Sequence, residues 1–569
     1  MAEVPVEGKG SEAGAFRWLH GPSPLASLLT PVPGAFPDVR ALPGALTLKE
    51  NRFRSVFHVP GAVLPGAGAE TGGLDLQDGV VVKVYRYPKA WDRLRYRILR
   101  HRAGQEWTAL RRLEEAGLPV PRPLALGEDR RGGTVTRAAL VISFIPDAVP
   151  LATRLEGLAG PGRAEALSLL ERTGSLIRRL HGAGVWHRDL HAGNILVSRR
   201  DGSLHLIDLH SAVFLPWLPP WLRRRGVARL CASLEGIVPD GGLGALVSAS
   251  GAGGPGAEDS IRRIARGIER TRIRSRSKRC FVPSTLFDVE TRSGERIYHL
   301  RSFSLEALAP LMKDAPPGEC LKRWPRGWVA AADAAGRRVC VKYRRHSWRE
   351  VLQALAESHP LRRAYGGGHS LRVRGIETPP VIALRERRVL GMVLEAHLIT
   401  DLVDGGVPLD RFLLDAYWGK PPARGAAARR KRLLAEEVGA FLRRVHDQGL
   451  SPHDFSPQNL LVAREALAAR EEDPGSSDPF LSWIDLDHLY LWKPLLERRR
   501  RRNLIQIANL PEGHVTTADR LRGLEAYARG ERDRLSAALV DALRHGILSE
   551  HYRVLERLLA RERTGRRPS

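Results

Sequence analysis

Two short stretches, far apart in the chain, each place an aspartate five residues before an asparagine and follow the asparagine with an apolar run. The first stretch holds Asp189 and Asn194, and the second holds Asp454 and Asn459. In phosphoryl transfer, an aspartate at this spacing accepts the proton of the attacking hydroxyl, and the asparagine amide turns back onto a metal ion. Both stretches therefore predict the catalytic loop of a phosphotransferase.

A second acid follows each loop at the end of an apolar strand pattern. These acids are Asp208 and Asp485, at the place where kinases keep the aspartate that holds Mg²⁺ across the nucleotide phosphates. The expected metal ligands are therefore Asn194 and Asp208 in the first half of the chain and Asn459 and Asp485 in the second. His210 stands two residues after Asp208, where a protein kinase has the glycine of its Asp-Phe-Gly motif.

The elements that must position these residues begin with a valine-rich strand. Residues 79–85 carry Lys83 among valines, and a lysine in a half-buried strand needs an anion to offset its desolvation. The α- and β-phosphates of ATP supply one anion, and the carboxylate of Glu106, on a helix predicted over residues 102–113, supplies another. We expect Lys83 to bind the nucleotide phosphates and to pair with Glu106.

The segment before this strand, residues 46–59, reads as strand, turn and strand without a Gly-x-Gly-x-x-Gly sequence. Protein kinases cover the nucleotide phosphates with such a glycine loop, so its absence argues against an ordinary protein kinase. Arg52 and Arg54 in this hairpin could meet the phosphates by charge instead, or they could be exposed hairpin arginines. Both interpretations stay open at this point.

The second half repeats this order with one departure. Lys342 stands in a strand pattern as the counterpart of Lys83 and as a second candidate for binding nucleotide phosphates. However, aligning the Gly-Pro turns that follow the two predicted helices puts Ala364 at the position of Glu106. Lys342 therefore lacks its expected partner.

Two glutamates earlier in this helical region, Glu350 and Glu357, are the candidates to replace the missing partner. Because Asp454, Asn459 and Asp485 are all present, the second half could still be active. We favour a weakly active or regulatory second half over a full second enzyme.

Both halves resemble the lipopolysaccharide kinases of the Kdo/WaaP type, which have a kinase-like fold. The resemblance covers roughly residues 45–240 of the first half. It rests on Lys83 in its strand, the Gln105-Glu106-Trp107 helix, the Gly117–Pro123 turn, the Asp189–Asn194 loop and Ile207-Asp208-Leu209. The resemblance implies an α+β, protein-kinase-like bilobal fold in two tandem copies. It also implies transfer of phosphate from ATP, with Mg²⁺, to a Kdo or heptose hydroxyl of the lipopolysaccharide inner core, at the cytoplasmic face of the inner membrane.

The acceptor is the least specified part of this expectation. Protein kinases and aminoglycoside or choline kinases share the same set of aspartate, asparagine and aspartate, so the set specifies fold and reaction better than substrate. The alternatives are a protein kinase or small-molecule kinase of the same fold, and a non-catalytic module that binds nucleotide.

The length and composition support two domains. The chain has 569 residues with 43% hydrophobic content, enough for at least two cores. We expect an irregular, Pro- and Gly-rich arm over residues 1–45, a catalytic kinase-like domain over 46–274 and a second, degenerate one over 275–569. A Gly-rich, turn-like stretch at 236–256 and a basic helix at 261–279 precede this boundary.

The net charge of +27 fits an acidic partner or surface, or an arginine-rich composition with a mostly solvated surface. The arginines are spread along the chain and lack a nucleic-acid reading motif, so nucleic acid is the least favoured partner. The four cysteines form no C-x-x-C pair, which indicates neither a zinc site nor a disulfide framework. Without a signal-peptide pattern or an apolar run long enough to span a membrane, we expect a cytosolic or peripheral protein.

Each half also places aromatic and apolar residues directly before an arginine cluster, at residues 214–225 and 489–502. Tryptophan and leucine beside arginine would suit the interface of an anionic membrane, where a glycolipid acceptor must arrive. A core segment that leads into a helix with a basic outer face is the alternative, and it is the one we favour.

Overall fold

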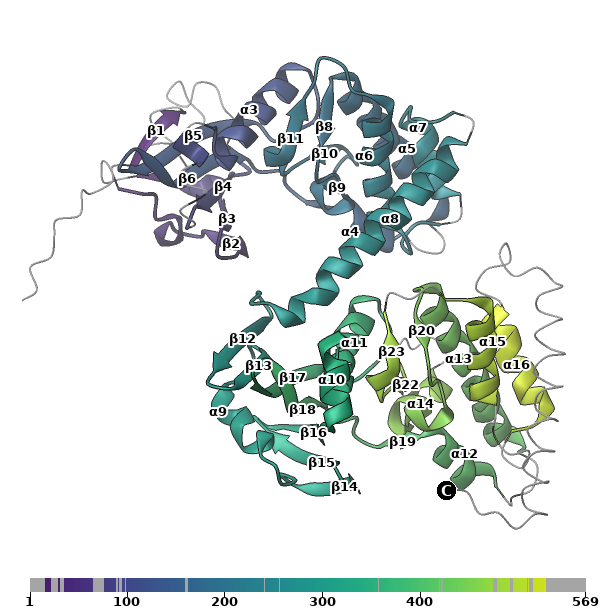
Figure 1. The fold of residues 1–569 in the computed structure, drawn as a ribbon. Helices are drawn as coiled ribbons and strands as arrows, with labels where there is room; N and C mark the ends of the chain where they lie inside the picture. Colours follow the sequence, from purple (N-terminus) through teal and green to yellow (C-terminus); the bar gives the residue numbers. More distant parts are fainter. Residues whose placement is uncertain are drawn as a thin grey trace, which may run out of the picture. The chain divides into compact units, whose positions relative to one another are not determined.

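The computed structural model of the chain describes residues 16–21, 29–30, 35–64, 76–88, 91, 95–97, 99–158, 162–239, 241–254, 256–356, 358–418, 420, 423–473, 478–491, 495–508, 510 and 515–528. The chain divides into two compact units, Met1–Arg270 (unit 1) and Thr271–Ser569 (unit 2). The division falls within helix α8 (Ala257–Ser277), whereas the sequence places the boundary near residue 275. Each unit combines an antiparallel sheet with a mainly helical part (Figure 1), so the predicted α+β class is confirmed.

Unit 1 begins with an antiparallel sheet whose six described strands are ordered β1-β5-β6-β4-β3-β2. Their bounds are β1 (Phe16–His20), β2 (Leu46–Glu50), β3 (Arg54–Val59), β4 (Val80–Arg86), β5 (Pro123–Arg131) and β6 (Thr134–Ser143). Strand β4 lies between β6 and β3, and all its residues except the last are buried, which explains its run of valines. The strands predicted within residues 46–59 and 79–85 are confirmed.

Strand β1 shows that the prediction of an irregular arm over residues 1–45 is wrong for Phe16–His20. It pairs with β5, with Phe16 opposite Asp129 and Trp18 opposite Gly127. A Cβ on Gly127 would lie 2.3 Å from the Phe16 ring, so the glycine leaves the room that the aromatic rings need. Pairing between segments this far apart leaves no local pattern in the sequence.

The rest of unit 1 is mainly helical. Its helices are α3 (Arg102–Glu115), α4 (Leu151–Glu156), α5 (Arg163–Gly182), α6 (Pro220–Leu234), α7 (Gly242–Ala249) and the first part of α8, and its short strands are β7 (Ala148–Pro150), β8 (Val185–His187), β9 (Ile195–Ser198), β10 (Leu204–Leu206) and β11 (Ala212–Phe214). Helix α5 buries Leu170, Leu176, Ile177 and Leu180 and ends just before β8. The core packing of α5 therefore fixes the start of the predicted catalytic loop.

Helix α7 lies in the Gly-rich stretch 236–256, for which the sequence predicts turns. It packs against α5 (Figure 1). The two helices approach closely at Gly174, where a Cβ would lie 2.5 Å from the carbonyl oxygen of Leu246. This close tertiary contact, more than local helix propensity, stabilises α7.

Unit 2 begins with an antiparallel sheet of seven described strands, ordered β12-β13-β17-β18-β16-β15-β14. Their bounds are β12 (Phe287–Arg292), β13 (Glu295–Leu300), β14 (Glu319–Trp324), β15 (Gly327–Ala334), β16 (Arg337–Arg345), β17 (Val381–Val389) and β18 (Met392–Asp401). Strand β16 lies between β18 and β15, just as β4 lies between β6 and β3 in unit 1. The lysine strands of the two units therefore occupy matching places.

Helices and short strands make up the rest of the described part of unit 2. The helices are α9 (Leu305–Leu308), α10 (Trp348–Ala356), α11 (Pro360–Val373), α12 (Leu409–Tyr417), α13 (Gly425–Asp447), α14 (Arg464–Glu472), α15 (Glu497–Ala508) and α16 (Thr517–Ala528), and the strands are β19 (Gly406–Pro408), β20 (Ser451–Pro452), β21 (Leu460–Ala463), β22 (Leu481–Trp483) and β23 (Leu489–Tyr490). None of the helices in the described part of the chain is long and apolar enough to cross a membrane.

Candidate active site

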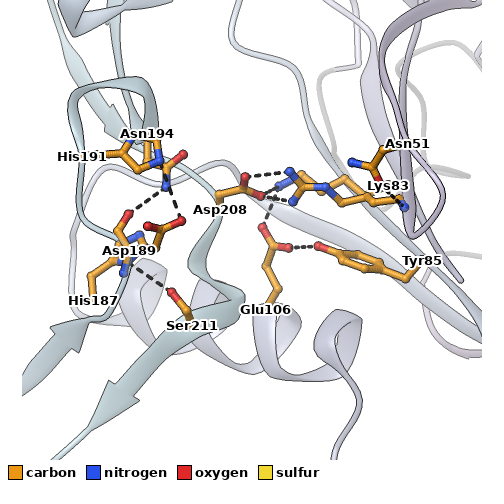
Figure 2. Close-up of polar contacts among 11 residues, drawn as sticks. Asn51, Lys83, Tyr85, Glu106, His187, Asp189, His191, Asn194, Asp208 and Ser211 are labelled. Carbon is orange, nitrogen blue, oxygen red and sulfur yellow. Dashed lines mark hydrogen bonds and ion pairs between the residues drawn. The ribbon is translucent and has the colours of Figure 1, made fainter. Parts of the chain in front are cut away.

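Lys83 lies at the centre of the site in unit 1. Its Nζ atom is 2.7 Å from Oε1 of Glu106 on α3 and 3.2 Å from Oδ1 of Asp208, which follows β10 (Figure 2). Burial opposes the charge of this ammonium group, but the two carboxylates outweigh burial and raise the pKa of Lys83. The structure thus brings together the strand lysine and the helix glutamate that the sequence paired.

Tyr85 is a site residue that the sequence reasoning missed. It lies two positions after Lys83 on β4, and its hydroxyl donates a hydrogen bond to Oε2 of Glu106 (Figure 2). Burial raises the pKa of Tyr85 well above its usual value, so the phenol keeps its proton and remains a donor. The period-two alternation of a strand places both side chains on one face and is the signal that could have found it.

Asp208 occupies a left-handed backbone conformation, with φ 62° and ψ 48°, which aspartate tolerates better than most residues. Its two carboxylate oxygens accept hydrogen bonds from the Arg54 guanidinium at 2.5 and 2.9 Å. Burial disfavours the charged carboxylate, but Lys83 and Arg54 outweigh burial and lower the pKa of Asp208. Asp208 therefore stays ionised between two cations.

The two arginines of the β2–β3 hairpin have different surroundings. Arg54, at the start of β3, is largely buried against Asp208, so it is not an exposed hairpin residue. Arg52 is exposed in the turn, and its guanidinium lies 6.0 Å from the centre of the Phe53 ring. The structure brings Arg54 into the site and leaves Arg52 outside it, because the turn between the strands faces solvent.

The predicted catalytic loop links β8 to β9. The Asn194 side-chain nitrogen donates to the backbone carbonyl of Asp189 at 2.9 Å, and the Ile207 amide donates to the carbonyl of Asn194 at 3.0 Å. These bonds tie the loop to the strand that ends at Asp208. The Asp189 side chain is 55% exposed, so its carboxylate is open to an incoming hydroxyl.

His187 stabilises the backbone of the catalytic loop. Its Nδ1 accepts the Asp189 amide hydrogen at 3.1 Å and lies 3.5 Å from the Ser211 hydroxyl (Figure 2). Burial lowers the pKa of His187 to about 4, so the ring is neutral and Nδ1 can accept. A structural role for this histidine agrees with its contacts.

Two further side chains approach the Asp189 carboxylate. His191 Nε2 lies 3.8 Å from one oxygen, and the Arg229 guanidinium, on α6, lies 3.9 Å from the other. These are weak ion pairs at an exposed group. Arg229 lies outside any motif, so only the fold of α6 against the loop reveals it.

The oxygen atoms of Asn194 and Asp208 fit a hard divalent cation such as Mg²⁺. Because the Asn194 nitrogen is bound within the loop, its amide oxygen is the atom suited to a metal. Glu106, Asp208 and His210 also lie close enough for their ligand atoms to fall within 4.8 Å of one another. Glu106 is bound by Lys83 and Tyr85, and Asp208 by Lys83 and Arg54, so a cation at either carboxylate would have to replace one of these contacts. Asn194 and Asp208 stay the predicted pair.

Unit 2 brings its lysine to a different pair of acids. Lys342 Nζ lies 2.8 Å from Oδ1 of Asp485 and 2.8 Å from Oδ2 of Asp487. Burial opposes the charge of Lys342, but these carboxylates outweigh burial and raise its pKa. The partner that the sequence reasoning could not find is Asp487, two residues after the predicted metal ligand.

Neither candidate replacement fills that place. The Glu350 carboxylate binds Arg344 and Ser347 instead, and Glu357 lies outside the described residues. In the second loop, the Asn459 side-chain nitrogen donates to the Asp454 carboxylate at 3.3 Å. In unit 2 the asparagine therefore binds the carboxylate of the loop aspartate, whereas in unit 1 it binds the backbone carbonyl of the loop aspartate.

The aromatic segment around the start of α6 divides between core and surface. Leu218 and Leu222 are buried, whereas Trp217 and Trp221 are 63% and 61% exposed. The leucines therefore serve the core, and the tryptophans face solvent ahead of the arginines at 223–225. In unit 2 the matching residues 492–494 lie outside the described residues.

Comparison with known proteins gives a family match in both units. The model of the lipopolysaccharide kinase (Kdo/WaaP) family matches residues 82–216 and 338–527. The first region contains Lys83, Asp189, Asn194 and Asp208, and the second contains the corresponding residues of unit 2. The repeated match, together with the two sheets, confirms the predicted kinase-like fold in tandem.

Curated relatives match over a shorter stretch. The 3-deoxy-D-manno-octulosonic acid kinase of Stenotrophomonas maltophilia (strain R551-3) is 41% identical over 137 residues, which cover 24% of this chain and 51% of that protein. The kinase of the same name from Xanthomonas campestris pv. campestris (strain B100) is 39% identical over 135 residues, with the same coverage. The chain thus spans about half the length of these curated relatives.

A solved structure of WaaP in complex with acyl carrier protein is 21% identical, with a TM-score of 0.31; the alignment covers 44% of this chain and 99% of that chain. The two regions matched by the family model together span more than half of the chain. The chain therefore belongs to the lipopolysaccharide kinase (Kdo/WaaP) family.

Proposed function

We propose that unit 1 transfers the γ-phosphate of ATP to a sugar hydroxyl, Kdo or heptose, of the lipopolysaccharide inner core. The observation that carries the proposal is the buried Lys83, bound to Glu106 and Asp208, beside the loop of Asp189 and Asn194. The name shared by the curated relatives, 3-deoxy-D-manno-octulosonic acid kinase, supports Kdo as the first acceptor to test.

Each residue has a definite part in this reaction. Lys83 would bind the nucleotide phosphates, and Asn194 and Asp208 would hold Mg²⁺, which would neutralise phosphate charge. The acceptor oxygen attacks the γ-phosphorus, and the bond from that phosphorus to the bridging oxygen of ADP breaks. The exposed Asp189 carboxylate receives the hydroxyl proton, and His187 holds its backbone in place.

The exposed tryptophans support contact with an anionic membrane surface. Trp217 and Trp221 stand directly before three consecutive arginines, and α6 begins between them at Pro220. Tryptophan prefers the membrane interface, and arginine is attracted to anionic headgroups. A glycolipid acceptor embedded in that surface would then reach the protein without leaving the membrane.

The test is transfer of labelled γ-phosphate from Mg·ATP to deacylated lipopolysaccharide core, in the wild type and in Asp189→Ala and Asp454→Ala variants. We expect Asp189→Ala to lower transfer by about 10³-fold or more, because the proton acceptor is lost. Asp404→Ala, at a side chain that is 70% exposed, is the control.

The outcomes separate the possible functions. Loss of labelling in Asp189→Ala alone assigns the reaction to unit 1. If wild-type protein binds ATP but labels no core sugar, the acceptor is wrong and protein and small-molecule acceptors come next. Binding without turnover on any acceptor would indicate a nucleotide-binding module.

A further inference from the structure

Helices α3 and α11 each begin with a histidine that makes the same two kinds of contact. His101 caps α3 and His359 caps α11, each accepting a backbone amide of the first turn. Each histidine also reaches a buried glutamate of the sheet: Glu128 on β5 at 3.2 Å and Glu386 on β17 at 2.8 Å. These paired contacts fix the correspondence between the two helices independently of the loops.

When α3 and α11 are aligned on these histidines, the carboxylate that partners the lysine stands at a different position in each unit. Five residues after the capping histidine, α3 has Glu106 and α11 has Ala364. Two residues after the left-handed aspartate, unit 1 has His210 and unit 2 has Asp487. Because His210 lies beside Glu106 and Asp208 in unit 1, the two exchanges occur at neighbouring positions of one site.

The number of carboxylates that contact the lysine is the same in both units. Lys83 has one carboxylate from the helix and one from the strand end, and Lys342 has two from the strand end. The Asp487 side chain is only 7% exposed. Its Oδ1 atom has no hydrogen-bond partner among the described residues, so burial of this carboxylate depends on Lys342.

Two further features of unit 2 fit a site that can bind a ligand. The Arg363 side chain, on α11 next to Ala364, donates to the backbone carbonyl of Asp487 at 2.9 Å and so holds the segment in place. In addition, β-strand register puts Gly327 where unit 1 has Arg54. Asp485 is accordingly 50% exposed, against 18% for Asp208, and lies open to a ligand.

We propose that Asp487 is a positioning residue that replaces Glu106, and that unit 2 binds a nucleoside polyphosphate with Lys342 on its phosphates. The inference rests on the proposed function only in taking the lysine of unit 1 as a phosphate ligand. It needs no assumption about the acceptor of phosphate.

The first experiment measures binding of Mg·ADP to the full chain by isothermal titration calorimetry. Lys83→Met removes the site in unit 1, so the remaining heat reports unit 2. We expect Asp487→Asn to weaken this binding about 10-fold or more, because Lys342 loses one of two carboxylates. Adding Ala364→Glu to Asp487→Asn should restore the affinity by returning a carboxylate to the helix.

The reciprocal experiment uses unit 1, with Lys342→Met removing the other site. Glu106→Ala should weaken Mg·ADP binding, and adding His210→Asp should restore it, since the pair then copies Ala364 and Asp487. For the unit 2 experiment, Asp404→Asn is the matched control for Asp487→Asn, because it makes the same change at an exposed aspartate of unit 2. Circular dichroism and thermal unfolding confirm that each variant is folded.

Three results overturn the inference. These are no Mg·ADP binding in the Lys83→Met parent, Asp487→Asn binding as tightly as the Asp404→Asn control, and weakened binding that the second substitution restores in neither unit. The last result would make Asp487 a structural residue only. Since core sugar is absent from the titration, a wrong acceptor for unit 1 would leave these results unchanged.

Discussion

At the scale of single residues, the Asp208 carboxylate is held by cations on two sides. Arg54 takes both oxygens, and Lys83 takes one of them. A divalent metal ion requires the same oxygens. We therefore expect Arg54 to leave Asp208 when Mg²⁺ and nucleotide bind, and the phosphates to offer its guanidinium a bidentate partner.

Replacing Arg54 by methionine tests this exchange. The Mg²⁺ concentration for half-maximal activity should fall by about 3–10-fold, because the cation that competes for Asp208 is gone. The KM for ATP should rise, because a phosphate ligand is lost. Kinetics at varied Mg²⁺ and ATP measure both, with the exposed Arg52→Met as the control; an unchanged Mg²⁺ requirement in Arg54→Met would contradict the exchange.

Residues that carry a motif could be predicted from the sequence, whereas residues whose role depends on their surroundings in the fold could not. Lys83 and Glu106 are predictable because each has a recognisable strand or helix around it. Asp487 is not, because it belongs to no motif and only the fold brings its carboxylate to Lys342. The separation of Arg54 from Arg52 likewise needs the hairpin, because both are arginines in the same turn region.

At the scale of elements, the close approach of α5 and α7 holds the helix that precedes the catalytic loop. A Cβ on Gly174 would lie 2.5 Å from the Leu246 carbonyl oxygen and 2.7 Å from the Ala249 side chain. We expect Gly174→Ala to lower the free energy of unfolding of unit 1 by about 2–4 kcal/mol, because the helices must separate.

Chemical denaturation of the full chain measures this change. Gly182→Ala is the matched control on the same helix, because a Cβ there meets no atom within 4 Å and alanine favours helix. Equal stability of the two variants would show that α7 adapts to the added methyl group and does not constrain α5.

The exposed tryptophans around the start of α6 provide a second prediction at this scale. The double variant Trp217→Ala/Trp221→Ala should bind vesicles of phosphatidylglycerol and phosphatidylethanolamine about 10-fold more weakly, since two interfacial side chains are lost. Cosedimentation measures this binding. Trp418→Ala, at a 52% exposed tryptophan of unit 2 without an adjacent arginine cluster, should bind like the wild type; equal binding by all three proteins would exclude this surface.

Elements with strong internal periodicity are those that the sequence predicts. Strand β4 and helices α3 and α5 follow from valine runs and apolar spacing. Strand β1 and helix α7 do not, because β1 depends on the space above Gly127 and α7 on the space beside Gly174. Both depend on partners distant in the chain, which no local pattern records.

At the scale of the whole molecule, buried histidines in both units make stability depend on pH. Burial lowers the pKa of His181, His187 and His397 to about 4 and that of His446 to about 3. An exposed histidine in the unfolded chain titrates near 6.5. The unfolded state therefore binds more protons between these values, and stability falls as the pH falls through this window.

Unfolding measured between pH 7.5 and 4.5 should show this loss in both units. Each histidine should contribute about 1–3 kcal/mol that is fully present above pH 6.5. His446, which contacts Tyr527 and Asn503, provides the control. His446→Gln should reduce the pH dependence of unit 2, to which His397 still contributes, and leave that of unit 1 unchanged. A stability that does not change across this range would contradict the prediction.

The place of the lysine's partner decides how each unit can be regulated. In unit 1 the partner belongs to α3, so an event that shifts this helix outward would part Glu106 from Lys83 and turn the site off. In unit 2 both carboxylates belong to one short segment after β22. Movement of α11 would act on them only through packing and the Arg363 contact to the Asp487 carbonyl, so we expect the lysine pairs of unit 2 to depend less on a helix shift than the Lys83–Glu106 pair of unit 1.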